Sequence, residues 1–328
     1  MRIFSGIQPT GQKHLGNLIG AIDQYVAGQD RGEGLYCIVD LHATTVSYDP
    51  KELRARTYDT AAVLLAAGLD PERCVFFRQG DVMEHTELCW LLCSVTSWGD
   101  LNRMHQFKEK AGTERELVSA GLFFYPVLQA ADVLAYRAAE VPVGDDQRQH
   151  IELMRDIAER FNSRFGKTLV VPEHRIPEVG ARIMDLQNPT VKMSTSAGSE
   201  QGRVHLMDEP AKILKKFRSA VTDSGDEVRR GEGKEGIANL IDIYAAVTGK
   251  RPDEVEAEFR DSRYGDFKTA VAEAVIERVA PIQERYLELR PDEAALEAAF
   301  TLGAQKAQLI ATKTLSDVRE AMGVGPRA

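Results

Sequence analysis

The stretch Val141-Pro142-Val143-Gly144-Asp145-Asp146-Gln147 determines the fold class of this chain, because a short apolar run ends in an acidic turn from which a helix starts. The helix has the clearest pattern in the sequence, one apolar stripe at helical spacing. The stripe consists of Ile151, Met154, Ile157, Ala158 and Phe161. Two aspartates at its start suit the positive end of a helix dipole. A strand followed by a helix in this way is typical of α/β proteins.

The same alternation extends toward the N-terminus. Short apolar runs at residues 1–4, 35–39 and 74–77 predict buried strands. Helical patterns lie between and after them, at residues 17–25, 50–65 and 84–94. Pro50 suits a helix start and Gly68 a helix end. Strands that alternate with helices predict a doubly wound, parallel, Rossmann-like sheet, with a ligand site at the carboxyl ends of its strands.

The second part of the chain has a different character. After about residue 200 only helical patterns remain, at 211–220, 237–247, 253–259, 267–289 and 292–322. Pro281 is expected to kink or divide one of them. We therefore predict a catalytic domain over residues 1–200 and an α-helical domain over residues 201–328, with the last helix packing back on the first domain.

Composition excludes several classes of protein. The 328 residues are 43% apolar and 28% charged, as in a soluble protein of two domains. No apolar run approaches the roughly 18 residues of a membrane helix, and the N-terminus lacks a signal-peptide core, so we expect a cytoplasmic protein. A net charge of -9 argues against a histone-like binder but permits a local basic face. Cys89 and Cys93 lack neighbouring ligands, so no structural metal is predicted.

A glycine turn near the start is a candidate phosphate site. Gln8-Pro9-Thr10-Gly11 is followed by His14-Leu15-Gly16-Asn17. Glycines allow close backbone approach, helix N-termini attract anions, and His14 and Asn17 can donate hydrogen bonds to phosphate or ribose. An ordinary strand-to-helix turn is the structural alternative. Walker-type and dinucleotide-binding glycine motifs are absent, which gives no support to a kinase-like or NAD-dependent enzyme.

Two further segments carry groups that suit a nucleotide. In Lys192-Met193-Ser194-Thr195-Ser196, the lysine can hold the β- and γ-phosphates and the serines can donate to phosphate. The alternative is a solvated surface loop. In the acidic turn, Asp145 and Asp146 can accept from ribose hydroxyls, and Gln147 can bind the polar end of a substrate. The alternative there is a plain helix start.

A polar line on an apolar helix predicts a second pocket. In Tyr125-Pro126-Val127-Leu128-Gln129-Ala130-Ala131-Asp132, Pro126 suits a first helical position, and Tyr125, Gln129 and Asp132 share one face. Such a line forms either a buried polar network or a ligand pocket. Asp132 would be an acceptor in apolar surroundings and would need a donor such as an indole N–H.

Taken in this order, the glycine turn, the acidic turn and the lysine loop resemble the motifs of class I aminoacyl-tRNA synthetases. The longer stretches, including Phe4-Ser5-Gly6-Ile7-Gln8, are similar to bacterial tryptophanyl-tRNA synthetases over nearly the whole chain. The resemblance implies an ATP site formed by Gln8, Pro9, Thr10, Gly16, Asn17, Gly144, Asp145, Asp146, Ile183, Lys192, Met193, Ser194, Thr195 and Ser196. It implies a tryptophan site formed by Phe4, Gly6, His42, Tyr125, Gln129, Asp132, Val143 and Gln147.

The chain differs from the wider class, or from some of its tryptophan enzymes, at three positions. Thr195 stands where the class usually has a second lysine, so other cations must contribute, and Lys108 matches a lysine of the family that contacts phosphate. Asn17 stands where the broader class has a second histidine. Gln129 replaces the methionine of some tryptophan enzymes, and the Tyr125, Gln129 and Asp132 spacing is similar to the pocket helix of tyrosyl-tRNA synthetases. The catalytic residues implied are Lys192, Lys108, His14, Asn17, Ser194 and Ser196.

The resemblance implies a tryptophan–tRNA ligase that uses ATP with Mg²⁺, charges tRNA(Trp) and forms a homodimer. The helical domain would bind the anticodon. Backbone contacts could come from Lys212, Lys215, Lys216, Arg218, Arg229 and Arg230, whose alternative is a solvated helix face. A tyrosine-specific relative and a synthetase-like RNA-binding protein without catalysis are the competing functions.

Overall fold

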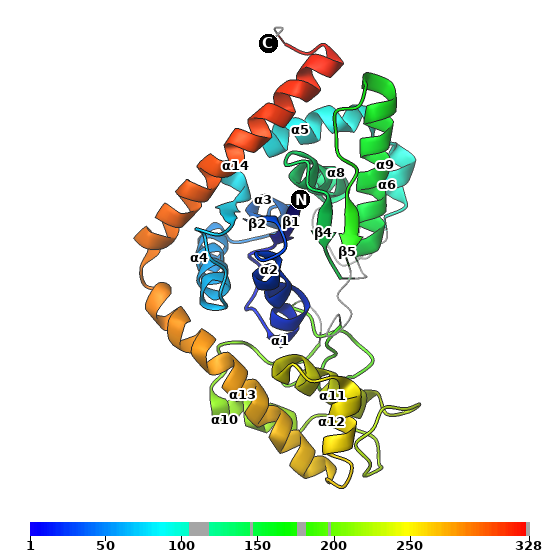
Figure 1. Cartoon of the computed structure of the whole chain (residues 1–328), viewed down its shortest axis with the longest axis vertical. Helices are drawn as coiled ribbons and strands as arrows, with labels where there is room; N and C mark the ends of the chain where they lie inside the picture. The colour runs from blue at the N-terminus through cyan, green and yellow to red at the C-terminus, as the bar shows by residue number, and fades with distance from the viewer. Residues whose placement is uncertain (105–117, 145–146, 176–181, 196–197, 326–328) are drawn as a thin grey trace.

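The computed structural model describes residues 1–104, 118–144, 147–175, 182–195 and 198–325 (Figure 1). Its centre is a five-stranded parallel sheet of order β3-β2-β1-β4-β5. The strands are β1 (Arg2–Ile7), β2 (Glu33–Ile38), β3 (Val75–Arg78), β4 (Glu140–Pro142) and β5 (Glu173–Arg175). The predicted doubly wound α/β fold with a helical C-terminal region is confirmed.

Strand β1 lies in the middle of the sheet. It pairs with β2 from Arg2↔Glu33 to Ile7↔Ile38, and on its other side with β4 through Ile3↔Glu140. The strand order therefore reverses between β1 and β4, which is where doubly wound sheets bind ligands.

The helices that follow the strands keep the predicted order. The first half contains α1 (Leu15–Asn17), the π-helix η1 (Leu18–Ile22), α2 (Asp23–Gly28), α3 (Asp40–Ala43), α4 (Pro50–Ala66), the 3₁₀-helix η2 (Gln79–Asp81), α5 (Glu84–Leu92), the 3₁₀-helix η3 (Cys93–Val95), α6 (Trp98–Asn102), α8 (Ala120–Leu134) and α9 (Arg148–Phe165). The helix predicted from Pro50 is α4. The Asp49 carboxylate caps it by accepting from the N–H groups of Lys51 and Glu52, and Gly68 follows its end with a positive φ of 114°.

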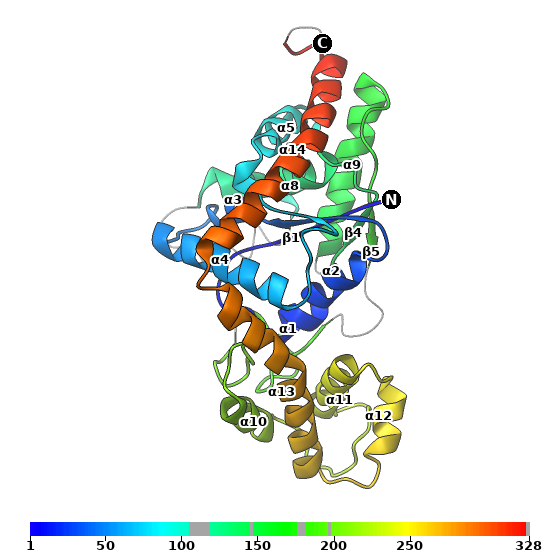
Figure 2. The same ribbon diagram turned by 60° about the vertical axis from the view of Figure 1, so that its left-hand side comes forward.

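Side chains of the central strands alternate between two apolar layers. Tyr36, Ile38 and Phe76 belong to one core cluster, with residues of η1 and α4, whereas Leu35, Cys37 and Phe77 belong to the other, with residues of α5, α8 and α9. Figure 2 shows helices on both faces of the sheet. The sheet is therefore buried on both faces, as its apolar strands require.

The second half is helical, as predicted. It contains α10 (Pro210–Arg218), α11 (Glu235–Thr248), α12 (Pro252–Glu258), α13 (Tyr264–Leu289) and α14 (Glu293–Met322). Pro281 does not divide a helix, because α13 continues through it. Buried Val279 and Ile282 flank the proline, so packing compensates for the hydrogen bond that it removes.

Helix α14 runs from the helical region back along the sheet (Figure 1). It contacts the edge strand β3, where the Phe300 and Phe76 rings lie 5.3 Å apart and Arg78 donates to Glu297 at 2.9 Å. Gly303 crosses the strand so closely that a Cβ there would lie 1.6 Å from the Phe76 carbonyl oxygen. The helix thus covers the edge of the sheet.

The expected helix start at Pro126 is wrong. Helix α8 begins at Ala120, where the Ser119 hydroxyl caps it by accepting from the Leu122 N–H at 3.1 Å, and Pro126 lies inside the helix. Buried Leu122 extends the apolar face N-terminal to the proline, so tertiary packing decides the helix start. Tyr125, Gln129 and Asp132 still lie on this one helix.

The helices within the described ranges include none with the length and hydropathy that crossing a membrane would demand.

Candidate active site

The candidate residues gather at the carboxyl ends of β1 and β4. Gln8, Pro9 and Thr10 come directly after β1, and Gly144 is the second residue after β4. Gly6 is exposed although its strand is the centre of the sheet. A Cβ on Gly6 would lie 2.9 Å from the Val39 side chain, so glycine allows close packing there while its backbone stays exposed at the switch point.

The buried side chain of Lys13 holds the glycine turn after β1. The ammonium of Lys13, which is 8% exposed, donates to the carbonyls of Gln8 at 2.8 Å and Thr10 at 3.2 Å. Burial, and then the positive charge of Arg56, lowers the pKa of Lys13 to about 8, against the opposing effect of Asp59. Gly11 has a φ of 58°, in the left-handed region that favours glycine.

His14 lies below the turn, where α1 begins. Its ring is 2% exposed, and its backbone N–H donates to the Asn17 Oδ1 at 3.0 Å, which leaves the amide NH₂ group as a donor. Burial lowers the pKa of His14 to about 3, and the charges of Arg203, His205, Lys13 and Lys192 act in the same direction. A neutral imidazole surrounded by cations suits a site for phosphate oxygens.

The lysine loop lies directly against this turn. The Met193 N–H donates to the Ile183 carbonyl at 2.9 Å, and Met184 and Lys192 form a β-bridge. The Thr195 methyl lies 1.9 Å from the position that a Cβ on Gly11 would occupy. The Met193 Cβ lies 3.6 Å from the corresponding position on Gly16. Segments almost two hundred residues apart in the chain therefore form one surface.

Some predicted residues have buried side chains. Ile183 is 2% exposed and Met193 is 1% exposed, and both belong to the core cluster that contains Leu15 and Leu18. These side chains position the loop from below. Lys108, Asp145, Asp146 and Ser196 lie outside the described residues.

The second predicted pocket lies beside the first. Gln129 on α8 donates to the Gln147 side chain, at the start of α9, at 3.4 Å. The Tyr125 hydroxyl contacts the His150 ring at 2.8 Å, and the Tyr125 and His42 rings lie edge to face at 6.2 Å. Helices α3, α8 and α9 thus bring predicted tryptophan-site residues together.

Two further residues predicted for the tryptophan site, Phe4 and Val143, come from the segments of β1 and β4. Phe4 is 3% exposed and stacks on Tyr136, with ring centroids 5.6 Å apart. Val143 is half-buried, and its N–H donates to the Arg175 carbonyl at 3.1 Å.

Asp132 is the most enclosed polar group of the pocket, with 1% of its surface exposed. Its Oδ1 accepts from the Gln79 amide at 2.7 Å and contacts the His85 Nδ1 at 2.6 Å, while its Oδ2 contacts the His42 Nε2 at 2.8 Å. Burial raises the pKa of the carboxyl, but His42 and His85 outweigh it and hold that pKa well below its usual range. Of the two interpretations that the sequence left open for this helix face, a buried polar network or a ligand pocket, the network is therefore present around Asp132.

Gln79, His85 and Tyr136 complete this network and were missed from the sequence. Each is fully buried. They come from three segments that the sequence gives no reason to join. From the sequence, these residues could have been found only by the general rule that a polar side chain within an apolar stretch needs a hydrogen-bond partner.

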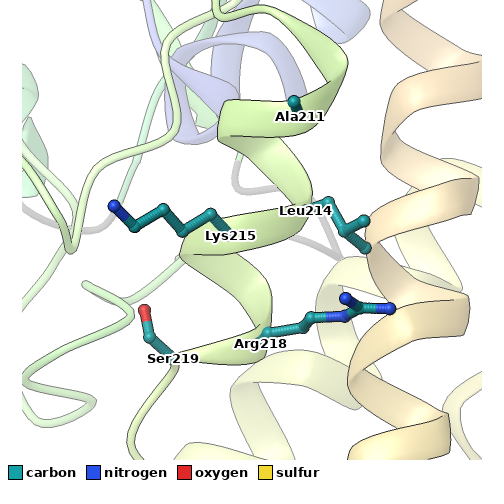
Figure 3. Close-up of a pocket in the computed structure, with 5 residues that line it drawn as sticks. All are labelled: Ala211, Leu214, Lys215, Arg218 and Ser219. Carbon is teal, nitrogen blue, oxygen red and sulfur yellow. The ribbon is translucent and has the colours of Figure 1, made fainter.

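The basic residues of α10 divide into two groups. Lys216 is 1% exposed and donates to Asp208 at 2.7 Å and to the Arg203 carbonyl at 2.5 Å, so its predicted RNA contact is wrong. Lys212 pairs with Asp208 at 2.7 Å. Lys215 and Arg218 flank a shallow hollow of about 410 Å³ and point to opposite sides of the helix (Figure 3).

A family model matches this arrangement. The model described as tRNA synthetases class I (W and Y) covers residues 1–280. A tryptophan–tRNA ligase of Wolinella succinogenes is 49% identical over 323 residues, which are 98% of each chain. The structure of a tryptophanyl-tRNA synthetase from Mycoplasma pneumoniae has a TM-score of 0.93 at 33% identity and covers 99% of this chain and 98% of its own. A Campylobacter jejuni tryptophanyl-tRNA synthetase complexed with ADP and tryptophan has a TM-score of 0.82 at 33% identity, covering 99% of this chain and 100% of its own.

Proposed function

The chain belongs to the tRNA synthetases class I (W and Y), and on this premise we propose that it activates L-tryptophan with ATP and joins it to the 3′ end of tRNA(Trp). The observation that most directly supports this proposal is the contact between the Lys192 loop and the glycine turn. It lies at the point where the strand order reverses. This contact encloses the side of the site where a triphosphate would lie. The activity is that of an aminoacyl-tRNA synthetase, a ligase.

In the first half-reaction, a carboxylate oxygen of tryptophan attacks the α-phosphorus of ATP. The bond from that phosphorus to pyrophosphate breaks, and tryptophanyl-adenylate forms. No covalent bond to the enzyme is needed, so catalysis consists of positioning and charge stabilisation. Lys192 and Lys108 would stabilise the leaving pyrophosphate, with donors from His14, Asn17, Ser194 and Ser196.

ATP would enter as its magnesium complex. Within the described residues, no group of three or more His, Cys, Asp and Glu side chains could hold a metal ion. The cations near His14 suit the phosphates and repel a free metal ion. In this proposal, Mg²⁺ reaches the site bound to the triphosphate.

The adenosine end would lie on the turn after β4. In this proposal, Gln8, Pro9, Thr10 and Gly16 approach ATP from β1, while Gly144, Asp145 and Asp146 approach from β4. Thr195 contributes shape through its contact with Gly11, where other members of the class carry a charge.

The amino-acid pocket would bind the two ends of tryptophan differently. Gln147 would bind the α-amino group, next to Gln129, from which it accepts a hydrogen bond. Asp132 would accept the indole N–H, and the rings of Tyr125 and His42 would line the pocket. A site built around one substrate hydrogen bond can reject analogues that lack it by roughly 10⁴.

In the second half-reaction, a hydroxyl of the terminal adenosine of tRNA attacks the acyl carbon and AMP leaves. Residues 201–328 would hold the anticodon stem. Lys215 and Arg218 are exposed cations of α10 that support this role, whereas the exposed Lys212 is paired with Asp208. Arg229 pairs with Glu227 at 2.6 Å and Arg230 pairs with Asp242, so both would have to exchange partners to reach RNA.

We also propose a homodimer in the cytoplasm, where the substrates of this reaction are found. Large apolar side chains are exposed around α5, α6 and α8. They are Met83, Trp90, Trp98 and Phe124, of which Trp90 is 77% exposed. Exposed apolar groups of this size in one region are typical of a protein interface.

The test is amino-acid-dependent exchange between ATP and pyrophosphate, run with Mg²⁺ and either tryptophan or tyrosine. Exchange with tryptophan alone is expected. Exchange with tyrosine alone would mean that Tyr125, Gln129 and Asp132 form a phenol pocket. Absence of exchange with both would favour a non-catalytic RNA-binding protein in which Thr195 marks the loss of activity.

A further inference from the structure

Asp132 is held by side chains that the proposed reaction does not use, and we propose that His85 and Tyr136 are positioning residues that make this carboxylate selective for an N–H donor. The inference rests on the proposed function, because it takes Asp132 as the reader of the indole. It adds to that function the groups that set the specificity of the reader.

The network around Asp132 has a defined direction. A carboxylate is an acceptor only, so the His85 Nδ1 must carry the hydrogen that it shares with Oδ1 at 2.6 Å. In a neutral ring the His85 Nε2 is then an acceptor, and the Tyr136 hydroxyl donates to it at 2.6 Å. Tyr136 thereby fixes the tautomer of His85, as outer partners of a functional histidine do.

Gln79 occupies the same carboxylate oxygen from another side. Its amide donates to Oδ1 at 2.7 Å, and its own oxygen accepts from the Leu41 N–H at 3.1 Å, so the amide cannot turn over without losing both bonds. Oδ1 consequently has two donors and is saturated. Oδ2 has only the His42 contact at 2.8 Å among the described partners and keeps acceptor capacity.

The open oxygen lies on the pocket side. His42, its partner, faces the Tyr125 ring edge to face at 6.2 Å, and both were assigned to the tryptophan site. His85 holds the other oxygen, Oδ1, and Tyr136 contacts only the far nitrogen of the His85 ring, so both act on the carboxylate from behind that oxygen. The structure therefore separates a supporting side of Asp132 from a reading side.

Packing keeps this support rigid. The Tyr136 ring stacks on Phe4 at 5.6 Å and meets Phe77 edge to face at 5.6 Å. Its hydroxyl therefore has one direction available, toward His85. Buried polar groups of this kind cost stability unless they are partnered, and apolar side chains would fill the same space without that cost. We infer that the network is kept because it holds the Asp132 carboxylate in one rotamer.

The experiment compares tryptophan with its 3-benzothienyl analogue, in which sulfur replaces the indole N–H, in pyrophosphate exchange by the whole enzyme. The variants are His85→Ala, His85→Asn, Tyr136→Phe and Asp132→Asn. Asparagine places its NH₂ group near the Nδ1 position, so it keeps the donor to Oδ1. Tyr36→Phe is the control, a buried tyrosine of the other core layer.

The wild type should prefer tryptophan over the analogue by at least about 10² in kcat/KM. We expect His85→Ala to reduce this ratio at least tenfold by raising the KM for tryptophan, with kcat and the KM for ATP nearly unchanged. His85→Asn should restore most of the ratio, Tyr136→Phe should reduce it severalfold, and Tyr36→Phe should not change it. If His85→Ala does not fold, the selectivity ratios of Tyr136→Phe and His85→Asn test the proposal instead.

The proposal is overturned if the His85 and Tyr136 variants affect both substrates equally, as a loss of packing alone would do. It is also overturned if Asp132→Asn retains the ratio, because Asp132 would then not read the indole. A wild type without tryptophan-dependent exchange would instead refute the proposed function, and this inference with it.

Discussion

At the scale of residues, the site depends on the contact between Gly11 and Thr195. Gly11 is restricted twice, by its φ of 58° and by the Thr195 methyl 1.9 Å from its absent Cβ. The threonine thus does more than replace a lysine, because it closes the loop over the turn. Lys192 lies three residues earlier in the same loop, where it forms a β-bridge with Met184.

We predict that Gly11→Ala impairs activation more than folding. The new methyl group must displace Thr195, which moves Lys192 relative to the glycine turn, so the exchange rate should fall by about 10² or more. Gly249→Ala is the matched control, since that glycine has a φ of 70° and nothing within 4 Å of a Cβ. Equal exchange rates in the two variants would refute the role of the contact.

Removing the loop cation should have a similar effect. Lys192→Ala is expected to lower the rate of tryptophan activation by about 10²-fold, because one well-placed charge contact with the leaving group is lost. Single-turnover formation of the adenylate measures this rate. Lys313→Ala, at an exposed position of α14, should retain the wild-type rate. An unchanged rate in Lys192→Ala would remove this residue from the mechanism.

The buried His14 should make stability depend on pH. Its pKa falls from 6.5 to about 3 on folding, so between these values the unfolded chain binds a proton that the folded chain does not. Stability is therefore lost as pH falls from 6.5 toward 3. At pH 5 this group should account for a loss of about 2 kcal/mol relative to pH 7.5.

Urea unfolding at the two pH values, at fixed protein concentration, measures the difference. In His14→Asn the loss between pH 7.5 and pH 5 should be smaller by that amount. His174→Gln, at an exposed position of β5, should keep the wild-type loss. A wild-type loss in His14→Asn would mean that the ring does not stay neutral.

How far the sequence predicted these residues depends on their spacing. Gly11, His14 and Lys192 stand in short motifs whose chemistry is local, so they could be named in advance. Gln79, His85 and Tyr136 act through partners that only the fold brings near, and no spacing in the chain relates them to Asp132. The burial of Lys216 could not be foreseen either, because a lysine on a polar helix face is usually solvated.

At the scale of elements, apolar strands and capped helices were predictable because their signals are local. Strand β5 was not, since Glu173, His174 and Arg175 are all exposed at the sheet edge and carry no apolar pattern. The start of α8 was misplaced because Pro126 normally marks a first turn, whereas packing of the residues before it extends the helix.

The crossing of α14 and β3 gives a test at this scale. Gly303→Ala would bring a methyl group within 1.6 Å of the Phe76 carbonyl oxygen, which is backbone and cannot rotate away. We expect a loss of about 1–3 kcal/mol in the free energy of unfolding. Thermal or urea unfolding measures the loss.

Gly265→Ala provides the comparison for this variant. It also lies within a helix, α13, but has nothing within 4 Å of a new Cβ. Its alanine variant should be neutral or more stable by about 0.5–1 kcal/mol. Equal stability of the two alanine variants would contradict the tight crossing.

At the scale of the whole molecule, the sheet order explains why one site draws on distant segments. Placing β1 beside β4 brings the turn after residue 7 next to the turn after residue 142. Bridges from residues 14 and 184 to the segments at 205 and 192 then bring the lysine loop to the same end. The resemblance to a family predicted this assembly, whereas the strand pattern alone gave only its fold class.

The proposed dimer belongs to the same scale. Trp90→Arg should convert the protein to monomers in sedimentation velocity, because it places a charge within the exposed apolar region of α5. Leu309→Arg is the control, since Leu309 is 78% exposed on α14 and Trp90 is 77% exposed. A dimer that survives Trp90→Arg, or one that Leu309→Arg disrupts, would move the interface elsewhere.

The central claim is that this chain charges tRNA(Trp) with tryptophan. The most direct measurement is aminoacylation of a tRNA(Trp) transcript by the whole chain, with labelled tryptophan or labelled tyrosine, ATP and Mg²⁺. The account predicts tryptophanyl-tRNA, with tyrosine attached at no more than about 10⁻³ of that rate. Tyrosine attached as fast as tryptophan, or no acylation by either amino acid, would contradict it.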